Sequence, residues 1–398
     1  MRRSTKTACW ALTLAVLAAT PAPAAEPDAD PHQLEVAGFP VVGYNSDHGL
    51  ALGLLGTLTR LHPDYDPHRW RLDGLAVVSV REDEAGDIEA SRQKYDLELD
   101  LPQFPTRALR LRLRPYFVLL KVANYYGLGN DSPDWDGQPE DVHQFEHLDA
   151  GLEAELRWAM TDALSLFGRA RGAYDAVQVY PGSALARDRA DPAGPDVRGV
   201  AAHDLAVLRL GALWDTRDDE NDPTTGSFHE LSARVGGSVV DDFAYTGAHV
   251  QGRWYLPVWG EHLTLATRAV ADLLGGHPPI YQLIWLGGDF NLRGVPEGRF
   301  AGKVRLLGTA ELRARFGQFR VLGPLPMRAG VVAFVDTGRV FADYADDPAL
   351  DGEGLGLKVG TGGGLRLRWG TSFVARGDVA WSPDGDGLGV YIGVEHVF

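Results

Sequence analysis

Cysteine is nearly absent from this chain of 398 residues, and positive charge is scarce. The one cysteine is Cys9, so the rest of the chain offers no disulfide, reactive thiol or cysteine-bound metal. Lys and Arg number 38 against 54 Asp and Glu, which gives a formal net charge of -16 at pH 7. Nucleic acid is excluded as a partner because binding to it requires a basic face.

Long apolar segments are also missing, with one exception at the start of the chain. Basic residues within the first six precede an apolar stretch from Ala8 to Ala19, and residues 22–24 (Ala-Pro-Ala) have the small-x-small pattern of a cleavage site. The stretch is too short to cross a bilayer as a helix. Residues 1–24 are therefore predicted to be a signal peptide, and residues 25–398 the exported protein.

The exported part is rich in alternation between apolar and charged residues. Leu109, Leu111 and Leu113 alternate with Arg110 and Arg112, and similar segments recur along the chain. Successive side chains of a β-strand point to opposite faces, so each segment predicts a strand with one apolar and one charged face. The charged faces also alternate in sign, with acids at 96, 98 and 100, arginines at 110, 112 and 114, and acids at 149, 153 and 155.

Two architectures produce such alternation. A soluble sandwich buries its apolar faces and leaves its polar faces wet. Strands with three or more full charges on one face, and opposite signs on neighbours, instead favour ion pairs across a lumen and apolar faces against lipid. The sequence therefore predicts an all-β protein, with residues 25–398 as a transmembrane antiparallel β-barrel in the bacterial outer membrane, in contact with its lipid and lipopolysaccharide.

Sixteen strands are expected. They cover residues 36–45, 49–61, 69–82, 88–101, 107–122, 144–159, 163–178, 203–216, 226–241, 242–257, 262–274, 303–317, 327–340, 357–369, 372–382 and 389–398. An even number puts both termini on the periplasmic side. The long connections 123–143, 179–202, 275–302 and 341–356 then all fall on the outer side, the usual asymmetry of such barrels. Pro40 in the first strand fits only at an edge or seam of the sheet.

Several motifs resemble those of the BamA/TamA outer-membrane barrels, the bacterial surface antigen family, which is related to the two-partner-secretion transporters. Residues 287–294 (GGDFNLRG) are similar to the family's Arg-Gly loop motif, with Val295 where the family usually has an aromatic residue. Residues 334–338 (FVDTG) match its F-x-D-x-G strand motif, and Glu311 lies on the strand between. The order and spacing of these three motifs make the resemblance specific.

Two further segments resemble the same family. Residues 214–218 (WDTRD), followed by Pro223 and Gly226, are similar to its periplasmic turn. The turn motif would consist of Asp215, Arg217 and Asp218, and a solvated turn is expected there because residues 215–222 lack the spacing of a calcium loop. The last strand resembles the sorting signal that outer-membrane barrels present to their assembly machinery, with Val390, Ile392, Val394 and Phe398 on one face.

Alternation also predicts where the loop and strand motifs point. Asp336 and Glu311 both lie on charged faces, so both carboxylates are expected in the lumen. Arg293, on a glycine-rich loop that folds into the barrel, would fork between them; a solvated position in an outer loop is the alternative. This candidate lock of the lumen loop comprises Gly287, Gly288, Arg293, Gly294, Glu311, Phe334, Asp336 and Gly338.

The resemblance implies insertion, assembly or translocation of protein or another substrate at the outer membrane, without a cofactor. Larger family members recruit clients through periplasmic POTRA domains, for which the segment before the first strand is too short, so an unidentified periplasmic partner is expected. No catalytic residue or metal site is expected, since the 12 histidines lack metal-ligand spacing. The alternatives are a passive pore or structural protein and, more remotely, a lipid hydrolase using His143, His203 or His277.

Overall fold

The computed structural model describes residues 34–65, 68–83, 86–133, 138–192, 194–319, 327–369, 373–385, 387–394 and 396–398. The signal peptide predicted over residues 1–24 lies outside the described residues. No helix in these ranges is long and apolar enough to cross a membrane.

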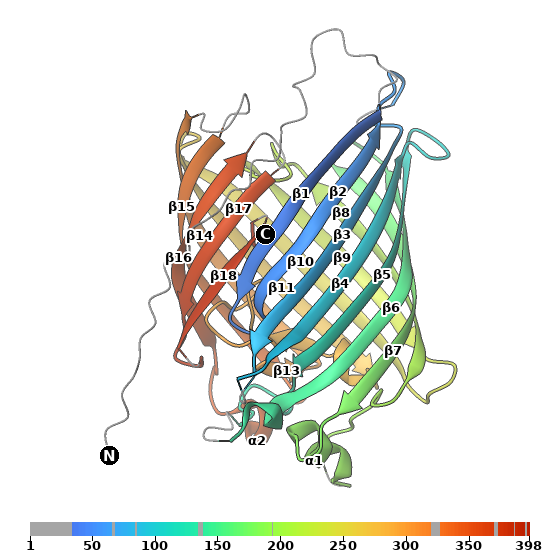
Figure 1. Ribbon diagram of the computed structural model, residues 1–398, viewed down its shortest axis with the longest axis vertical. Helices are drawn as coiled ribbons and strands as arrows, with labels where there is room; N and C mark the ends of the chain where they lie inside the picture. The colour runs from blue at the N-terminus through green and yellow to red at the C-terminus, as the bar shows by residue number, and fades with distance from the viewer. Residues whose placement is uncertain are drawn as a thin grey trace.

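Sixteen antiparallel strands form a closed barrel, as predicted from the alternation (Figure 1). They are β1 (Leu34–Asn45), β2 (Gly49–Arg60), β3 (Trp70–Glu82), β4 (Ile88–Pro102), β5 (Leu109–Asn124), β6 (Gln144–Ala159), β7 (Leu164–Val179), β8 (His203–Asp215), β9 (Gly226–Gly237), β10 (Ala244–Trp259), β11 (Leu263–Gly276), β14 (Val304–Phe319), β15 (Met327–Phe341), β16 (Lys358–Trp369), β17 (Phe373–Trp381) and β18 (Leu388–Val394). Consecutive strands pair with each other, except that β11 pairs with β14 because β12 and β13 form a separate small sheet. The barrel closes between β18 and β1.

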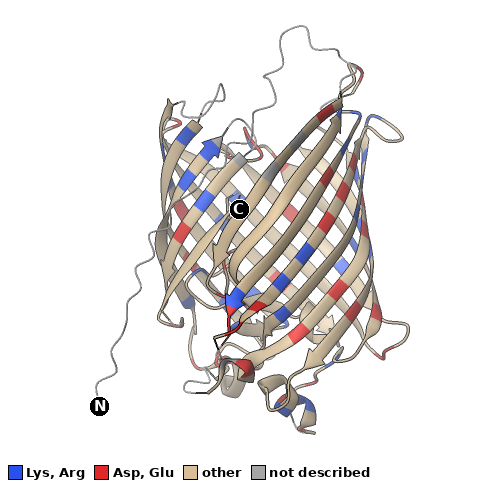
Figure 2. Ribbon diagram, in the orientation of Figure 1, with Lys and Arg blue, Asp and Glu red and all other residues tan. Residues whose placement is uncertain are grey.

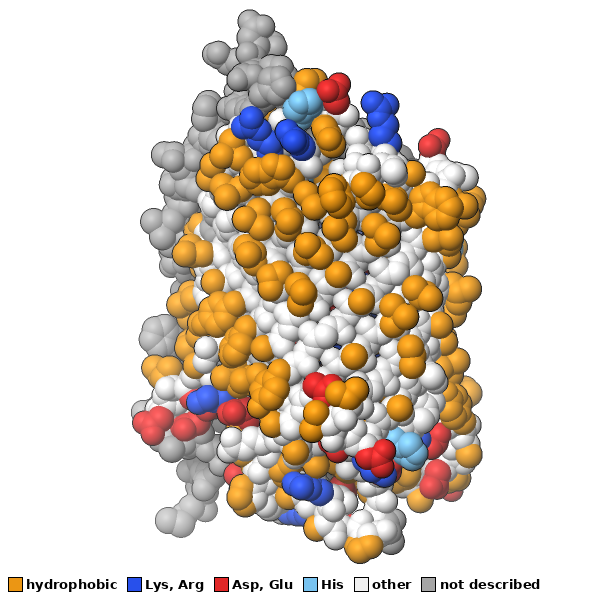
Figure 3. Space-filling view, turned by 90° about the vertical axis from the view of Figure 1, so that its right-hand side faces the viewer, with side chains coloured by type: hydrophobic (Ala, Val, Ile, Leu, Met, Phe, Trp, Pro, Cys, Tyr) orange, Lys and Arg blue, Asp and Glu red, His pale blue; other side chains and the backbone are white. Residues whose placement is uncertain are grey.

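The barrel wall is inverted relative to the core of a soluble protein (Figure 3). Leu152 and Leu156 of β6 have exposed fractions of 52% and 45%, whereas Glu155 of the same strand has only 4%. In Figure 3, hydrophobic side chains cover the outer surface over most of its height, and charged side chains gather toward the two ends. The outer face therefore suits contact with lipid hydrocarbon, as predicted.

The charged faces meet inside the barrel as cross-strand ion pairs, and Figure 2 shows rows of alternating sign running across β3 to β7. Arg110 Nε donates to Asp100 at 2.7 Å, and Arg114 Nε donates to Asp96 at 2.8 Å, both between β5 and β4. On the other side of β5, Arg112 lies directly opposite Glu155 of β6. Opposite charges on facing positions stabilise the pairing of neighbouring strands.

The long connections lie together at one end of the barrel (Figure 1). They contain η1 (Glu140–His143), α1 (Ala184–Ala190), η2 (Ile280–Gln282), β12 (Ile284–Leu286), β13 (Phe300–Gly302) and α2 (Pro348–Asp351). Side chains from three of these connections form a buried cluster around Tyr125, Leu185 and Ile280. This arrangement agrees with the parity of the predicted strands.

The end of the ninth strand differs clearly from the prediction. The strand predicted over residues 226–241 ends at Gly237 as β9, and residues 238–243 form a turn. The carboxylate of Asp204 accepts hydrogen bonds from the backbone N–H groups of Val239 and Val240 at 3.3 and 3.2 Å. A side chain from the neighbouring strand β8 thus takes over the backbone donors that a longer strand would have used.

Candidate functional site

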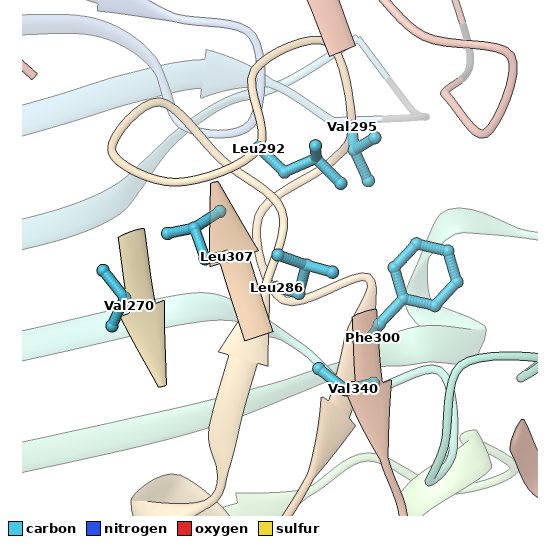
Figure 4. Close-up of a cluster of buried hydrophobic side chains, with 7 residues drawn as sticks. All are labelled: Val270, Leu286, Leu292, Val295, Phe300, Leu307 and Val340. Carbon is cyan, nitrogen blue, oxygen red and sulfur yellow. The ribbon is translucent and has the colours of Figure 1, made fainter. Parts of the chain in front are cut away.

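The connection from β11 to β14, residues 277–303, folds into the barrel and is here called the lumen loop. Its side chains Leu286, Leu292, Val295 and Phe300 are at most 1% exposed and pack against Val270, Leu307 and Val340 of β11, β14 and β15 (Figure 4). Full burial of a side chain of this kind contributes about 1.5–3 kcal/mol. The apolar residues therefore anchor the loop to the wall, and the valine at 295 fits this cluster without an aromatic ring.

Arg293 lies at the centre of the loop's polar contacts and is completely buried. Its Nε and Nη2 atoms fork onto the carboxylate of Asp336 at 2.7 and 3.0 Å, and its Nη1 lies 2.8 Å from Glu311 Oε1. The guanidinium carbon lies 3.3 Å from the ring centroid of Phe334. The structure thus brings together the arginine, both carboxylates and the phenylalanine that the sequence singled out.

The charge of Arg293 is held in place by these neighbours. Burial opposes the charged form, but hydrogen bonds to Asp336 and the charges of Asp336 and Glu311 outweigh burial and raise the pKa of Arg293. The arginine therefore stays a cation throughout the physiological range. A buried cation with bidentate and additional carboxylate contacts fixes both the position and the orientation of the loop.

Asp378 of β17 is a third carboxylate of the site and is not among the residues predicted from the sequence. Its Oδ2 lies 3.3 Å from Arg293 Nη1, and its Oδ1 accepts a hydrogen bond from Arg366 at 2.5 Å. Glu311 in turn accepts from Arg313 Nε at 2.8 Å. The signal was available, since Arg376 and Asp378 occupy alternate positions of their strand and therefore share the charged face.

Glycines allow the lumen loop to turn and to approach the wall closely. Gly287, Gly288 and Gly294 have φ values of 120°, 99° and 89°, a region that side chains disfavour. A Cβ atom on Gly294 would lie 2.8 Å from the carbonyl carbon of Trp381, and one on Gly338 would lie 2.8 Å from Leu286 Cδ1. Gly294 and Gly338 therefore set the fit between loop and strands.

The predicted turn motif consists of Asp215, the last residue of β8, and of Arg217 and Asp218 in the turn between β8 and β9, residues 216–225. Arg217 Nε and Nη2 fork onto the carboxylate of Asp215 at 2.9 and 2.7 Å. Asp218 accepts hydrogen bonds from the backbone N–H groups of Thr224 and Thr225 at 2.9 and 3.1 Å. The three motif residues thus act within the turn and shape it.

The same turn reaches other strands of the barrel and is more buried than expected. Asp222 has an exposed fraction of 6%, and it accepts a hydrogen bond from Arg315 Nη2 of β14 at 2.6 Å. Arg368 of β16 donates to Asp219 at 2.6 Å. The prediction of a solvated turn is therefore wrong for Asp222, because arginines of distant strands bind its carboxylate. No group of His, Cys, Asp and Glu suited to a metal ion occurs in the described part of the chain.

The end of the chain departs from the predicted strand. β18 ends at Val394, and Phe398 is 6% exposed and packs against Tyr255 inside the barrel. The guanidinium carbons of Arg268 and Arg313 each lie 5.0 Å from the ring centroid of Phe398. The lumen thus offers this ring cation–π contacts that lipid lacks. The prediction that Phe398 shares one face of a last strand with Val390, Ile392 and Val394 is therefore wrong.

A short seam closes the barrel between β1 and β18. The described residues of these strands pair at two positions, Tyr44 with Ile392 and Asn45 with Tyr391. On its other side, β1 pairs with β2 along its whole length. Residues 34–43 thus present a strand edge with no partner among the described residues, and Pro40 lies in this edge strand, where a proline is tolerated.

These features define a class of protein, an outer-membrane-type β-barrel whose lumen holds an arginine-anchored loop. Residues 88–394 match the model of the Omp85 superfamily domain, and the chain belongs to this superfamily.

Solved structures of similar fold include two kinds of barrel. BamA from Haemophilus ducreyi lacking POTRA domains 1–3 has a TM-score of 0.58 and 16% identity, over 91% of this chain and 70% of that one. CdiB from Escherichia coli has a TM-score of 0.56 and 14% identity, over 90% of this chain and 62% of that one. CdiB from Acinetobacter baumannii has a TM-score of 0.51 and 12% identity, over 91% and 59%. A comparison with curated proteins gives no significant match. At these identities the likeness establishes the fold.

Proposed function

We propose that this protein inserts or translocates polypeptides at the outer membrane and receives them at the edge of β1 that faces the seam. Membership of the Omp85 superfamily supports a role of this general kind. The finer proposal rests on the edge formed by residues 34–43, for which the described residues supply no partner strand. In hydrocarbon, each unpaired backbone N–H or C=O group costs several kcal/mol, so such an edge favours the addition of a strand from another chain.

In this proposal the chain termini face the periplasm and the long connections face outward. A separate periplasmic partner would deliver unfolded clients to the periplasmic end of β1. No cofactor is required, because strand addition consists of hydrogen bonding and burial of apolar side chains.

The loop that folds into the lumen weighs against a passive pore. The lumen loop is anchored by four buried apolar side chains and by the ion pairs of Arg293. An open pore needs a wet channel. In planar bilayers we expect the wild-type protein to show little steady conductance, and large stable channels would favour the pore instead.

The histidines proposed for a lipid hydrolase are engaged in other contacts. His143 stacks on Tyr126 with ring centroids 4.2 Å apart, and His203 Nε2 lies 2.6 Å from the hydroxyl oxygen of Tyr281. His277 Nδ1 lies 2.6 Å from Asp196. None of these contacts pairs a histidine with a serine, which a hydrolase with a serine nucleophile would need.

Photo-crosslinking tests the proposed function. A photoreactive amino acid is placed at Val42 of β1, beside the seam, or at Leu152 of the continuous wall, positions with similar exposed fractions of 59% and 52%. In the outer membranes of living cells we expect polypeptide adducts at Val42 and only lipid adducts at Leu152. Equal polypeptide adducts at both positions, or none at Val42, would contradict client binding at the seam.

A further inference from the structure

The lumen loop contacts both sides of the seam that closes the barrel. Residues 293–297 lie against β17 and β18 at one end and against the turn between β1 and β2 at the other. These five residues span the junction from the lumen side, where the strands themselves pair at only two positions.

The contacts on the β18 side begin at Gly294. Its backbone N–H donates to the hydroxyl oxygen of Tyr391 at 3.0 Å, and Tyr391 is one of the two β18 residues that pair with β1. Arg376 of β17 donates to Asp289 of the loop at 2.7 Å. With Arg293 bound to Asp378, this end of the segment is fixed to the last two strands.

The contacts on the β1 side involve Glu297. Its backbone N–H donates to Asp47 Oδ1 at 3.0 Å, and its carboxylate lies 2.9 Å from His48 Nε2. His48 is buried, and its carbonyl oxygen accepts a hydrogen bond from Ser91 of β4 at 2.6 Å. The turn that receives Glu297 is therefore itself tied to the wall beyond β2.

We propose that residues 293–297 form a latch that holds the seam closed, joining β18 through Tyr391 to the β1–β2 turn through Asp47 and His48. Separation of β1 from β18 then requires release of the Glu297 end of the latch. The side chain of Glu297 is 43% exposed, whereas that of Arg293 is completely buried among carboxylates, so the latch opens at Glu297 while the rest of the loop stays in the lumen. This inference concerns regulation of the seam and rests on the proposed function for its purpose.

Charge around Asp47 makes the latch sensitive to pH. Four groups interact electrostatically with Asp47 or with its neighbour Glu297: Asp289 of the loop, His48 of the turn, Arg92 of β4 and Tyr391 of β18. Arg376 of β17 in turn faces Asp289. Burial and the nearby carboxylate of Glu297 raise the pKa of Asp47 to about 7. A raised carboxyl pKa stabilises the folded contact at low pH, and this contribution is lost as pH rises through about 7.

Disulfide trapping tests the latch. Cysteines replace Tyr44 and Ile392, a facing pair across the seam, in a Cys9→Ser background. Directly opposite residues in antiparallel strands lie about 4.5–5.5 Å apart at Cα, within disulfide range. The rate of oxidation by a membrane-permeant catalyst in lipid vesicles then reports the closed seam. As a control, a second cysteine pair replaces Leu54 and Ala76, which face each other between β2 and β3. Its oxidation rate measures the reactivity of a cysteine pair away from the seam.

We expect Glu297→Ala and Asp47→Ala each to slow trapping at the seam several-fold and to leave the second pair unchanged. The matched control is Lys303→Ala, which removes an ion pair of the same loop with Asp343 of the outer rim, 2.7 Å in length and away from the seam. Unchanged seam trapping in both latch variants, or equal slowing by Lys303→Ala, would overturn the latch. The assay needs no client, so its outcome is independent of the crosslinking test at Val42.

The pH dependence gives a second readout. Relative to the β2–β3 pair, trapping at the seam should slow as pH rises from about 6 to about 8, because Asp47 ionises beside Glu297. Asp47→Asn keeps the acceptor for the Glu297 N–H and removes the charge, so it should trap at the same relative rate across this range. An Asp47→Asn variant with the wild-type pH profile would refute the role of Asp47.

Discussion

Replacement of Arg293 by alanine leaves one carboxylate, that of Asp336, without an ion-pair partner among the described residues. Arg293 is the only cation that the described residues place within ion-pair distance of Asp336, whereas Glu311 keeps Arg313 at 2.8 Å and Asp378 keeps Arg366 at 2.5 Å. Removal of one partner from a buried ion pair costs about 3–5 kcal/mol, because the other charge stays buried. We expect the free energy of unfolding of Arg293→Ala to fall by this amount.

A second substitution tests the assignment to Asp336. Asp336→Asn in the Arg293→Ala background removes the uncompensated charge and should recover part of the loss, whereas Asp378→Asn should not. Urea titration of the protein in lipid vesicles, followed by tryptophan fluorescence, measures the free energies. Protease digestion of residues 287–299 measures release of the loop. A loss of less than about 1 kcal/mol, the size of an ordinary substitution, or equal rescue by Asp378→Asn would refute the reasoning.

Three further substitutions probe the wall, the turn and the end of the chain. Leu152→Arg on the lipid face should destabilise the protein folded in vesicles by about 2–4 kcal/mol. An unchanged stability would contradict the contact of Leu152 with lipid. Asp222→Asn should weaken the contact with Arg315 and make residues 216–225 sensitive to protease in detergent, while Glu220→Gln on the same turn serves as control. Phe398→Ala should destabilise the barrel by about 3–5 kcal/mol, and a neutral effect would argue against its seat beside Tyr255.

The barrel strands were predictable because membrane and lumen impose opposite demands on alternate residues. Over residues 109–114 of β5 and 152–157 of β6, outward apolar residues such as Leu152 alternate with inward charges such as Glu155, so the periodicity defines these strands. The same alternation predicted that the carboxylates of Glu311 and Asp336 lie in the lumen, where Arg293 of the loop could pair with them. Asp378 follows the same rule and was overlooked.

Contacts beyond the strand ladder could not be predicted in this way. Phe398 follows the last residue of β18, and a repeat of two carries no information once the chain has left the sheet. Its position depends on Arg268 and Arg313, which come from β11 and β14. Asp222 is buried by Arg315 of β14, a residue 93 positions away in the chain. Such contacts are set by closure of the barrel, which no local pattern encodes.

The lumen loop precedes in sequence most of the residues that hold it. Arg293 is made before Glu311, Asp336 and Asp378, and Gly294 before Tyr391, whereas Asp47 comes from the first hairpin. During assembly the loop therefore cannot make all of its contacts until β14 to β18 have formed and the first and last strands have met. Docking of the loop in the lumen is then a late event that marks a completed barrel. A barrel whose assembly stops before its last strands form leaves residues 287–299 exposed to proteases.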